Sequence, residues 1–366
     1  MTASGPESQL PGPAGIRSLL IVRLGSMGDI IHTLPAAFGL RAALPDATIG
    51  WIVEEHWADL LCARSEPQSG PRSPRRPVVD KLHLVNTKRW RKNLASMETW
   101  ERVAAAISEL RAPRYDVAVD FQGAARSAVL ARLSGASTIY GFRQPRENVA
   151  SMLYSRQALA SGSHIAEQNM SLAEAAVGES LETPNILLPC NEVAERHCTR
   201  WLQDHAVDKF ILLNPGAGWG AKQWPADRYG QLAQELAKLG FQPLINYGPN
   251  EEDLARAVAA SSGGAATPIC WPLAELIALT RHASLLVGGD TGPMHLAAAL
   301  GIPVVALFGP TNPARNGPFG ARSIVLRDPS SQTSHQRRSQ TDPGLLRIQV
   351  ADALAAALQL LGKSVG

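Results

Sequence analysis

The stretch SLLIVRLGSMGDIIHTLPAAFGLRAALP, residues 18–45, decides the fold class of this chain. It opens with a serine and four apolar residues, Leu19 to Val22, as expected of a strand that is buried on both faces of a parallel sheet. A turn with two glycines, Gly25 and Gly28, follows, and an apolar helical segment comes next. A strand, a glycine-bearing turn and a helix in this order form the repeating unit of a doubly wound α/β domain.

Strand and helix patterns alternate in two runs along the rest of the chain. In the first run the further strands are expected at residues 48–55, 115–123 and 137–142. The second run begins near Lys209, and its strands are expected at residues 209–218, 241–248, 284–289 and 302–309. This spacing predicts parallel sheets. Two such runs predict two Rossmann-like, doubly wound domains that face each other across a cleft.

The expected division of the chain has four parts. We expect a flexible N-terminal tail (1–16), a first Rossmann-like domain (17–185), a second one (186–345) and a closing C-terminal helix (346–366). The polar stretch at 327–344 is interpreted as a long loop.

Bulk composition narrows the function classes. A length of 366 residues suits two domains, and a net charge of +3 is too small to indicate nucleic acid as a partner. The four cysteines form no CxxC pair, which favours unpaired thiols in a reducing compartment. No apolar run approaches the ~20 residues that cross a bilayer. We therefore expect a soluble, cytoplasmic protein whose membrane contact, if present, is peripheral.

Asp29 is an unusual residue for the first turn. A helix N-terminus attracts anions, so a carboxylate there would oppose a bound pyrophosphate. One interpretation is a capping box formed by Ser26 and Asp29, worth about 1 kcal/mol. The other is a base at the carboxyl end of a strand, where ligands bind in open α/β sheets. His32, one helical turn later, could orient this carboxylate.

A nicotinamide site is a weaker alternative at the same turn. Gly25 and Gly28 match part of a dinucleotide fingerprint, but the third glycine is absent. Glu54 and Glu55 end the second strand, where an acid could hold a ribose. Asp29 itself counts against this alternative.

Residues 64–92 carry nine Lys and Arg against two acids. Their first half is rich in Pro and Ser and is expected to be mobile. The denser part, KRWRK at 88–92, is either a solvated charged loop or a site for an anionic acceptor.

The second half of the chain carries a stronger anion-binding pattern. In DTGPMH (290–295) the hydroxyl of Thr291 and the backbone at Gly292 could meet a diphosphate at a helix N-terminus, with His295 within reach. Asp290 could simply cap that helix. In NPGAGWGAK (214–222) three glycines precede Lys222, which could neutralise a leaving diphosphate. No DxD pair occurs, so no two-carboxylate metal site is indicated.

Taken in order, these motifs resemble a known family. LIVRLGSMGDIIHTLPA, WIVEE, KRWRKN, DFQGAARSA, RENVASMLYSR, HIAEQN, KQWP and DTGPMHLAAALGIPVVALFGPTNP are similar to the bacterial ADP-heptose:lipopolysaccharide heptosyltransferases, over residues 17 to 320. The resemblance implies a GT-B fold, with the acceptor on the first domain and the sugar nucleotide on the second. It also implies that Asp29 is the general base, which would explain the carboxylate in the turn.

The resemblance assigns further residues. With Asp29, Lys222 is expected to be catalytic. The donor is expected to contact Ala217, Gly218, Lys222, Glu251, Trp271, Asp290, Thr291, Gly292 and His295. The acceptor is expected to contact Ser26, Met27, Gly28, Arg89, Arg91, Lys92, Gln122 and Arg146. The chain departs from the family at Ala217 and Gly218, where hydroxyl residues are usual, and at Trp271, which replaces a methionine and could stack on adenine.

The implied reaction is an inverting transfer of heptose from ADP-heptose to anionic Kdo-lipid A at the cytoplasmic face of the inner membrane. No cofactor, no obligatory metal and no nucleic-acid partner are expected. The alternatives are a GT-B enzyme with another nucleotide sugar or acceptor, an NAD(P)-dependent oxidoreductase, and a non-catalytic binding protein.

Overall fold

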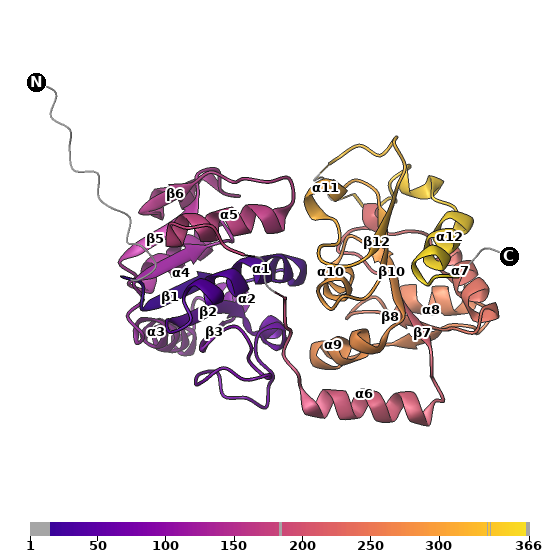
Figure 1. Cartoon of the computed structure of the whole chain (residues 1–366), viewed down its shortest axis with the longest axis horizontal. Helices are drawn as coiled ribbons and strands as arrows, with labels where there is room; N and C mark the ends of the chain where they lie inside the picture. The colour runs from indigo at the N-terminus through magenta and orange to yellow at the C-terminus, as the bar shows by residue number, and fades with distance from the viewer. Residues whose placement is uncertain (1–14, 183–184, 335, 337, 364–366) are drawn as a thin grey trace, which may run out of the picture.

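The computed structural model describes residues 15–182, 185–334, 336 and 338–363, and it contains two parallel six-stranded sheets (Figure 1). The first has the order β3-β2-β1-β4-β5-β6, from β1 (Ser18–Val22), β2 (Thr48–Glu54), β3 (Lys81–Val85), β4 (Val117–Asp120), β5 (Thr138–Phe142) and β6 (Arg156–Ala158). The second has the order β12-β11-β10-β7-β8-β9, from β7 (Phe210–Asn214), β8 (Gln242–Asn246), β9 (Thr267–Ile269), β10 (Leu285–Gly289), β11 (Val304–Phe308) and β12 (Ser323–Arg327).

Helices connect the strands of each sheet. The first half contains α1 (Met27–Ala43), α2 (Thr87–Lys92), α3 (Met97–Arg111), α4 (Ala125–Leu133) and α5 (Ile165–Val177), with short 3₁₀ helices η2 (Glu55–Leu60) and η3 (Asn148–Leu153). The second contains α6 (Glu192–Asp204), α7 (Ala226–Lys238), α8 (Glu252–Ser261), α9 (Leu273–His282), α10 (Gly292–Ala299), α11 (Pro313–Asn316) and α12 (Val350–Leu360), with η4 (Gly220–Lys222) and η5 (Leu345–Arg347).

Both sheets have the strand order of a doubly wound dinucleotide-binding domain, in which later strands are added on the opposite side of the first strand. This reversal of the strand order falls between β1 and β4 in one sheet and between β7 and β10 in the other. The predicted α/β class is therefore confirmed. Ligands of such sheets bind outside the carboxyl ends of the strands at this reversal, which is where Asp29 and Asp290 lie.

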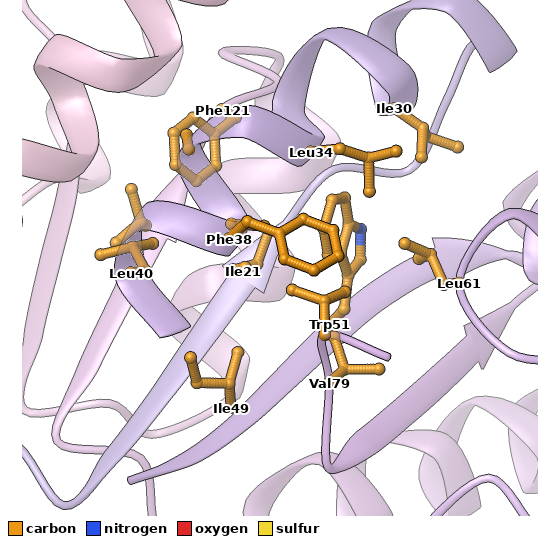
Figure 2. Close-up of a cluster of buried hydrophobic side chains, with 14 of the residues drawn as sticks. Ile21, Ile30, Leu34, Phe38, Leu40, Ile49, Trp51, Leu61, Val79 and Phe121 are labelled. Carbon is orange, nitrogen blue, oxygen red and sulfur yellow. The ribbon is translucent and has the colours of Figure 1, made fainter. Parts of the chain in front are cut away.

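The core of the first sheet also supports its functional edge. Figure 2 shows Phe38 of α1 and Trp51 of β2 in one buried cluster, and both side chains are almost completely buried. Each such side chain contributes about 1.5–3 kcal/mol by burial. The indole nitrogen of Trp51 donates a hydrogen bond to the carbonyl of Arg23 at 3.0 Å. The core thus holds the backbone at the end of β1, just before the turn that carries Asp29.

The two halves of the molecule share a hydrophobic cluster. Leu276 and Ile277 of α9 and Leu296 of α10 pack in the same cluster as the core of the first sheet. Helix α1 packs against α10, and a Cβ added at Gly28 would lie 2.7 Å from the ring of His295. Met27 approaches Gly292 just as closely, at 2.5 Å from an added Cβ. The turn that carries Asp29 is therefore in direct contact with the second sheet's helices.

Some local expectations were wrong. KRWRK at 88–92, for which a solvated loop was one interpretation, lies in α2, and the Pro- and Ser-rich half expected to be mobile surrounds the buried side chain of Arg76 before β3. Arg76 donates to the carbonyls of Pro67, Pro71 and Val79, which orders a segment that composition alone presents as flexible. The expected tail lies outside the described residues except for Gly15 and Ile16, and Ile16 is buried in the core.

Candidate active site

Asp29 lies in the first turn of α1, where both of its carboxylate oxygens have partners. Its Oδ2 accepts hydrogen bonds from the backbone N–H of Ser26 at 3.0 Å and from the Ser26 hydroxyl at 3.2 Å. Its Oδ1 forms an ion pair with Nη2 of Arg23 at 2.9 Å. The capping arrangement predicted for Ser26 and Asp29 is therefore present, and Arg23 holds the other oxygen.

A position for a substrate proton remains on this carboxylate. An ionised carboxylate has about four acceptor positions, and three of those on Asp29 are used, so one remains on Oδ1. The side chain is 37% exposed, whereas that of Arg23 is 6% exposed. Asp29 is thus fixed from the protein side and open to a ligand. His32, by contrast, packs its ring against His164 and His295 and is not the group that orients Asp29.

Asp120 at the end of β4 fixes the neighbouring loop. It accepts hydrogen bonds from Ser127 and Tyr154, and from the backbone N–H groups of Gln122 and Gly123. Its complete burial raises the pKa of Asp120 to about 6, although these hydrogen bonds act in the opposite direction. The side chain of Gln122 accepts from the backbone of the Asp29 turn, at Leu24 N, 3.1 Å away.

A cavity of about 660 Å³ opens beside this carboxylate. The first half of the chain lines it with Arg23, Asp29 and Arg146, together with Gln122. The second half contributes residues that the sequence had not indicated, Trp219 and Arg315. Among the described residues that line this cavity, three arginines accompany a single carboxylate, so the cavity favours an anionic ligand.

The second candidate cluster joins Lys222, Asp290 and His295. Lys222 Nζ lies 2.7 Å from Asp290 Oδ2 and donates to the Asp290 carbonyl at 3.3 Å, and His295 Nε2 lies 3.1 Å from Asp290 Oδ1. Burial by itself would raise the pKa of Asp290. The hydrogen bond and charge of His295, with the ammonium of Lys222, outweigh burial and hold this pKa well below its usual range.

The loop after β7 lies over this cluster. Asn214, at the end of β7, donates to Thr291 Oγ1 at 3.1 Å, and so joins the glycine loop to the DTG turn. Glu251 packs against Gly216 and accepts from Gly248 N at 2.8 Å, while an added Cβ at Gly218 would meet no atom within 4 Å. These predicted donor residues, though not Trp271, are therefore gathered around an accessible stretch of backbone.

Lys222 connects the two candidate clusters. Its ammonium lies 5.3 Å from the ring centroid of Trp219, which lines the cavity beside Asp29. The ring of Trp219 and the cavity thus lie between Asp29, the predicted base from the first half, and Lys222, the predicted cation from the second. Such a site can bind an anion and a polar sugar between them.

The polar segment at 338–342 packs against the turn that carries Lys222. Ala221 N donates to the carbonyl of Arg338 at 3.1 Å, and Asp342 N donates to the carbonyl of Ala221 at 3.2 Å. Gly220 faces the carbonyl of Ser339 so closely that no larger residue fits. The polar stretch expected to be a loop therefore packs against the lysine turn.

Not every predicted site residue joins these clusters. Met27 and Gly28 pack against α10 and do not line the cavity. Trp271 follows β9, two strands from β7, and its ring contacts Trp201 and His197. Arg89, Arg91 and Lys92 belong to α2, which is exposed and lies outside the cavity lining. Glu54 accepts from Thr87 at the start of α2, so it is not available to a ribose.

Comparison with known proteins decides the family. The model of glycosyltransferase family 9 (heptosyltransferase) matches residues 103–345, about two thirds of the chain. The chain belongs to glycosyltransferase family 9.

Relatives of this family 9 enzyme agree with that assignment. Lipopolysaccharide heptosyltransferase 1 of Pseudomonas aeruginosa is 31% identical over 84% of this chain and 83% of its own length. Lipopolysaccharide heptosyltransferase 3 of Escherichia coli K12 is 28% identical over 78% of this chain and 80% of its own. The E. coli heptosyltransferase WaaC, solved with ADP-2-deoxy-2-fluoro heptose, superposes with a TM-score of 0.69 at 26% identity, covering 92% of this chain and 97% of its own.

The family 9 assignment shows that the chain is a glycosyltransferase with the predicted GT-B fold, and it sets aside the oxidoreductase alternative. Within the described part of the chain, no group of three or more His, Cys, Asp or Glu residues could hold a metal ion. No helix in those same residues is long and apolar enough to cross a membrane. All four cysteines are described, and all are unpaired.

Proposed function

We propose that this enzyme transfers L-glycero-D-manno-heptose from ADP-heptose to a Kdo residue of Kdo-lipid A, with inversion at the anomeric carbon. The observation that carries the proposal is the cavity beside Asp29, because it brings residues of both halves of the chain to one place and is rich in arginine. The acceptor would bind on the first domain (17–185) and the sugar nucleotide on the second (186–345).

In the proposed reaction, Asp29 removes the proton from an acceptor hydroxyl while that oxygen attacks the anomeric carbon. A carbon–oxygen bond forms, and the bond between the anomeric carbon and the phosphate oxygen breaks. ADP leaves with the electron pair, and Lys222 at the DTG turn neutralises the developing charge. A single displacement inverts the anomeric centre. Arg146 would bind the carboxylate of Kdo, since guanidinium groups suit carboxylates.

Two related activities differ from this one in the substrate. A relative named heptosyltransferase 3 suggests an acceptor that already carries heptose, and a GT-B enzyme could use another nucleotide sugar. The WaaC complex with an ADP-heptose analogue supports ADP-heptose as the donor here. A titration of ADP against UDP tests the nucleotide, and acceptors with and without a first heptose test the acceptor.

The decisive experiment incubates the protein with ADP-heptose and Kdo-lipid A and follows the product by mass spectrometry. We expect the mass of one heptose to be added and an inverted anomeric configuration by NMR. Asp29→Asn should abolish transfer while ADP binding, measured by calorimetry, survives. Asp46→Asn is the matched control, since Asp46 is an exposed acid just after α1. Near-normal turnover by Asp29→Asn would refute the base assignment.

We also propose that the enzyme meets its acceptor at an anionic membrane surface, on the cytoplasmic face of the inner membrane. Two features of the corner between α2 and α3 support this. Lys88, Arg91 and Lys92 are exposed, and none of them forms an ion pair with another described residue. Leu94, Met97 and Trp100 beside them are more than half exposed. Basic and apolar side chains together are typical of peripheral membrane contact.

A further inference from the structure

Arg315 comes from α11 in the second half of the chain, yet it lines the cavity that holds Asp29. Its side chain is exposed and donates to Asn316 Oδ1 at 3.0 Å. It forms no ion pair with any other residue that the structure describes. A charged guanidinium that faces a cavity without an acid partner is available to a ligand.

The other arginines of the cavity divide into two kinds. The charge of Arg23 is already matched by Asp29. Arg146, like Arg315, is exposed and has no ion-pair partner in the described chain. The cavity therefore offers two uncompensated guanidinium groups, one from each half of the molecule.

A helix cap and two contacts with the first half of the chain hold the segment around Arg315 at the cavity. The side chain of Asn312 accepts from Ala314 N at 3.0 Å and so caps α11. Beyond the helix, His164 Nε2 lies 3.0 Å from the carbonyl of Gly317. His164 Nδ1 accepts from Ala166 N, so its Nε2 carries the proton and donates to this carbonyl. The ring of His164 also stacks on Phe319, at 4.9 Å between centroids.

We propose that Arg315 is a specificity-determining residue for the acceptor, and that the acceptor presents two acidic groups, one to Arg146 and one to Arg315. The second group is a carboxylate or a phosphate, because both match the planar fork of a guanidinium. This inference rests on the proposed function for the identity of the sugar. It adds that the acceptor site is complete only when both domains contribute to it.

Steady-state kinetics with three short, lipid-free acceptors test the proposal. The first is a Kdo glycoside with one carboxylate, the second a Kdo disaccharide with two, and the third a Kdo glycoside that also carries a phosphate. For Arg315→Gln we expect KM to rise by about 10-fold or more with one or both of the doubly acidic acceptors. The affected acceptor identifies the second group. KM for the singly acidic acceptor should change by less than about 2-fold.

Matched variants distinguish the loss of a contact in the cavity from a general effect of removing one positive charge. Arg322→Gln removes an exposed arginine of the same domain that does not line the cavity, and it should leave every KM unchanged. Arg315→Lys should recover part of the loss, since it keeps the charge without the fork. The KM for ADP-heptose should stay constant in all three. Equal effects on all acceptors, or no effect on any, would overturn the proposal.

Failure of the proposed function would look different. If the wild-type enzyme transfers heptose to none of the acceptors, the reaction is wrongly assigned. Calorimetric binding of the Kdo disaccharide and of the phosphorylated glycoside then still tests Arg315, because binding needs no turnover. Weaker binding of either ligand to Arg315→Gln than to Arg322→Gln would support the anion site, and equal binding of both would refute it.

Discussion

Arg23 brings a positive charge into the interior of the first domain. Two of its nitrogens have partners, the carboxylate of Asp29 and the carbonyl of Phe121, while its buried Nε has none. Arg23 is buried, and Asp29 is its only ion-pair partner among the described residues, although the 37% exposure of Asp29 lets solvent screen part of the attraction. The pair fixes one oxygen of Asp29 from the protein side, and Arg23 is therefore a positioning residue for the proposed base.

At the residue scale we predict that Arg23→Gln lowers kcat by about 10- to 100-fold while ADP affinity, measured by calorimetry, stays constant. The carboxylate would lose its fixed orientation but not its chemistry. Arg23→Lys should recover part of kcat, because an ammonium can keep the ion pair. Arg17→Gln, at an exposed position just before β1, is the control. A rise in KM with an unchanged kcat would instead make Arg23 a substrate contact.

The sequence placed some cavity residues correctly and missed others. Asp29, Gln122 and Arg146 follow strands of one parallel sheet and line one cavity, and the family resemblance had already grouped Gln122 and Arg146 as acceptor residues. Trp219 and Arg315 were missed because they reach the cavity from the other domain, and no local pattern reveals that. Arg23 stood in the opening motif as a charged residue directly after a buried strand, and this position is the signal that could have identified it. The catalytic and binding roles stay predictions.

Among the elements, α2 is held at the carboxyl edge of the first sheet. Its first residue, Thr87, donates to Glu54 at the end of β2, and Asn86 caps it by accepting from Arg89 N at 3.1 Å. The basic face of α2 is therefore presented at the same edge as the Asp29 turn. The exposed apolar corner that follows continues this surface, with Trp100 Nε1 donating to the carbonyl of Leu94 at 2.8 Å.

For this element we predict that replacing Leu94, Met97 and Trp100 together by Ser reduces binding to phosphatidylglycerol vesicles several-fold. These side chains are 56%, 74% and 53% exposed, so the protein should still fold. Sedimentation with vesicles that contain no acceptor measures the binding. Leu187→Ser with Val193→Ser, both 59% exposed, is the matched control. Binding that is unchanged in the triple variant, or equal on neutral vesicles, would contradict a membrane role for this corner.

Central elements were predictable from the sequence, whereas edge elements were not. Strands such as β1 and β7 are fully buried and contain four consecutive apolar residues each, a pattern that is visible in the sequence. β12 is only partly buried, and β6 and β9 have three residues each. Their strand conformation depends on pairing with a neighbouring strand, which is a tertiary effect. The same holds for α2, whose residues show no apolar face.

At the scale of the whole molecule, three buried histidine rings lie at the contact between the two domains. His32 lies 4.2 Å from His295 and 5.2 Å from His164 between ring centroids, and His295 comes from the second domain. Burial, with the nearby rings of His295 and His164, lowers the pKa of His32 well below 6.5. Burial also lowers the pKa of His164, against its hydrogen bond to Gly317. The lowered pKa values favour the neutral forms of His32 and His164 at this domain contact.

The stability of the molecule should consequently depend on pH. In the unfolded chain His32 takes up a proton near pH 6.5, while the folded chain resists it. The protonation of His32 therefore leaves the unfolding free energy unchanged above pH 6.5. This free energy decreases as the pH falls from 6.5 toward the lowered pKa of His32. Between pH 6.5 and 5, the unfolding free energy of His32→Gln should fall less steeply than that of wild type, by up to about 1.4 kcal/mol per pH unit.

Denaturant titrations at several pH values measure this difference. Comparison with wild type is necessary because Asp120, with a pKa raised to about 6, favours folding at lower pH and so opposes the histidines. His205→Gln, at an exposed histidine just after α6, is the control and should keep the wild-type slope. Equal slopes for His32→Gln and wild type would show that His32 takes up its proton equally in both states.

The close fit of Gly28 to His295, and of Gly292 to Met27, has a consequence for evolution and for engineering. Each glycine leaves just enough space for a side chain of the opposite half, so a substitution at either position requires a compensating substitution in the other half. A hybrid made by joining one half of this chain to the matching half of a distant relative should assemble poorly unless each glycine and its partner side chain are kept together.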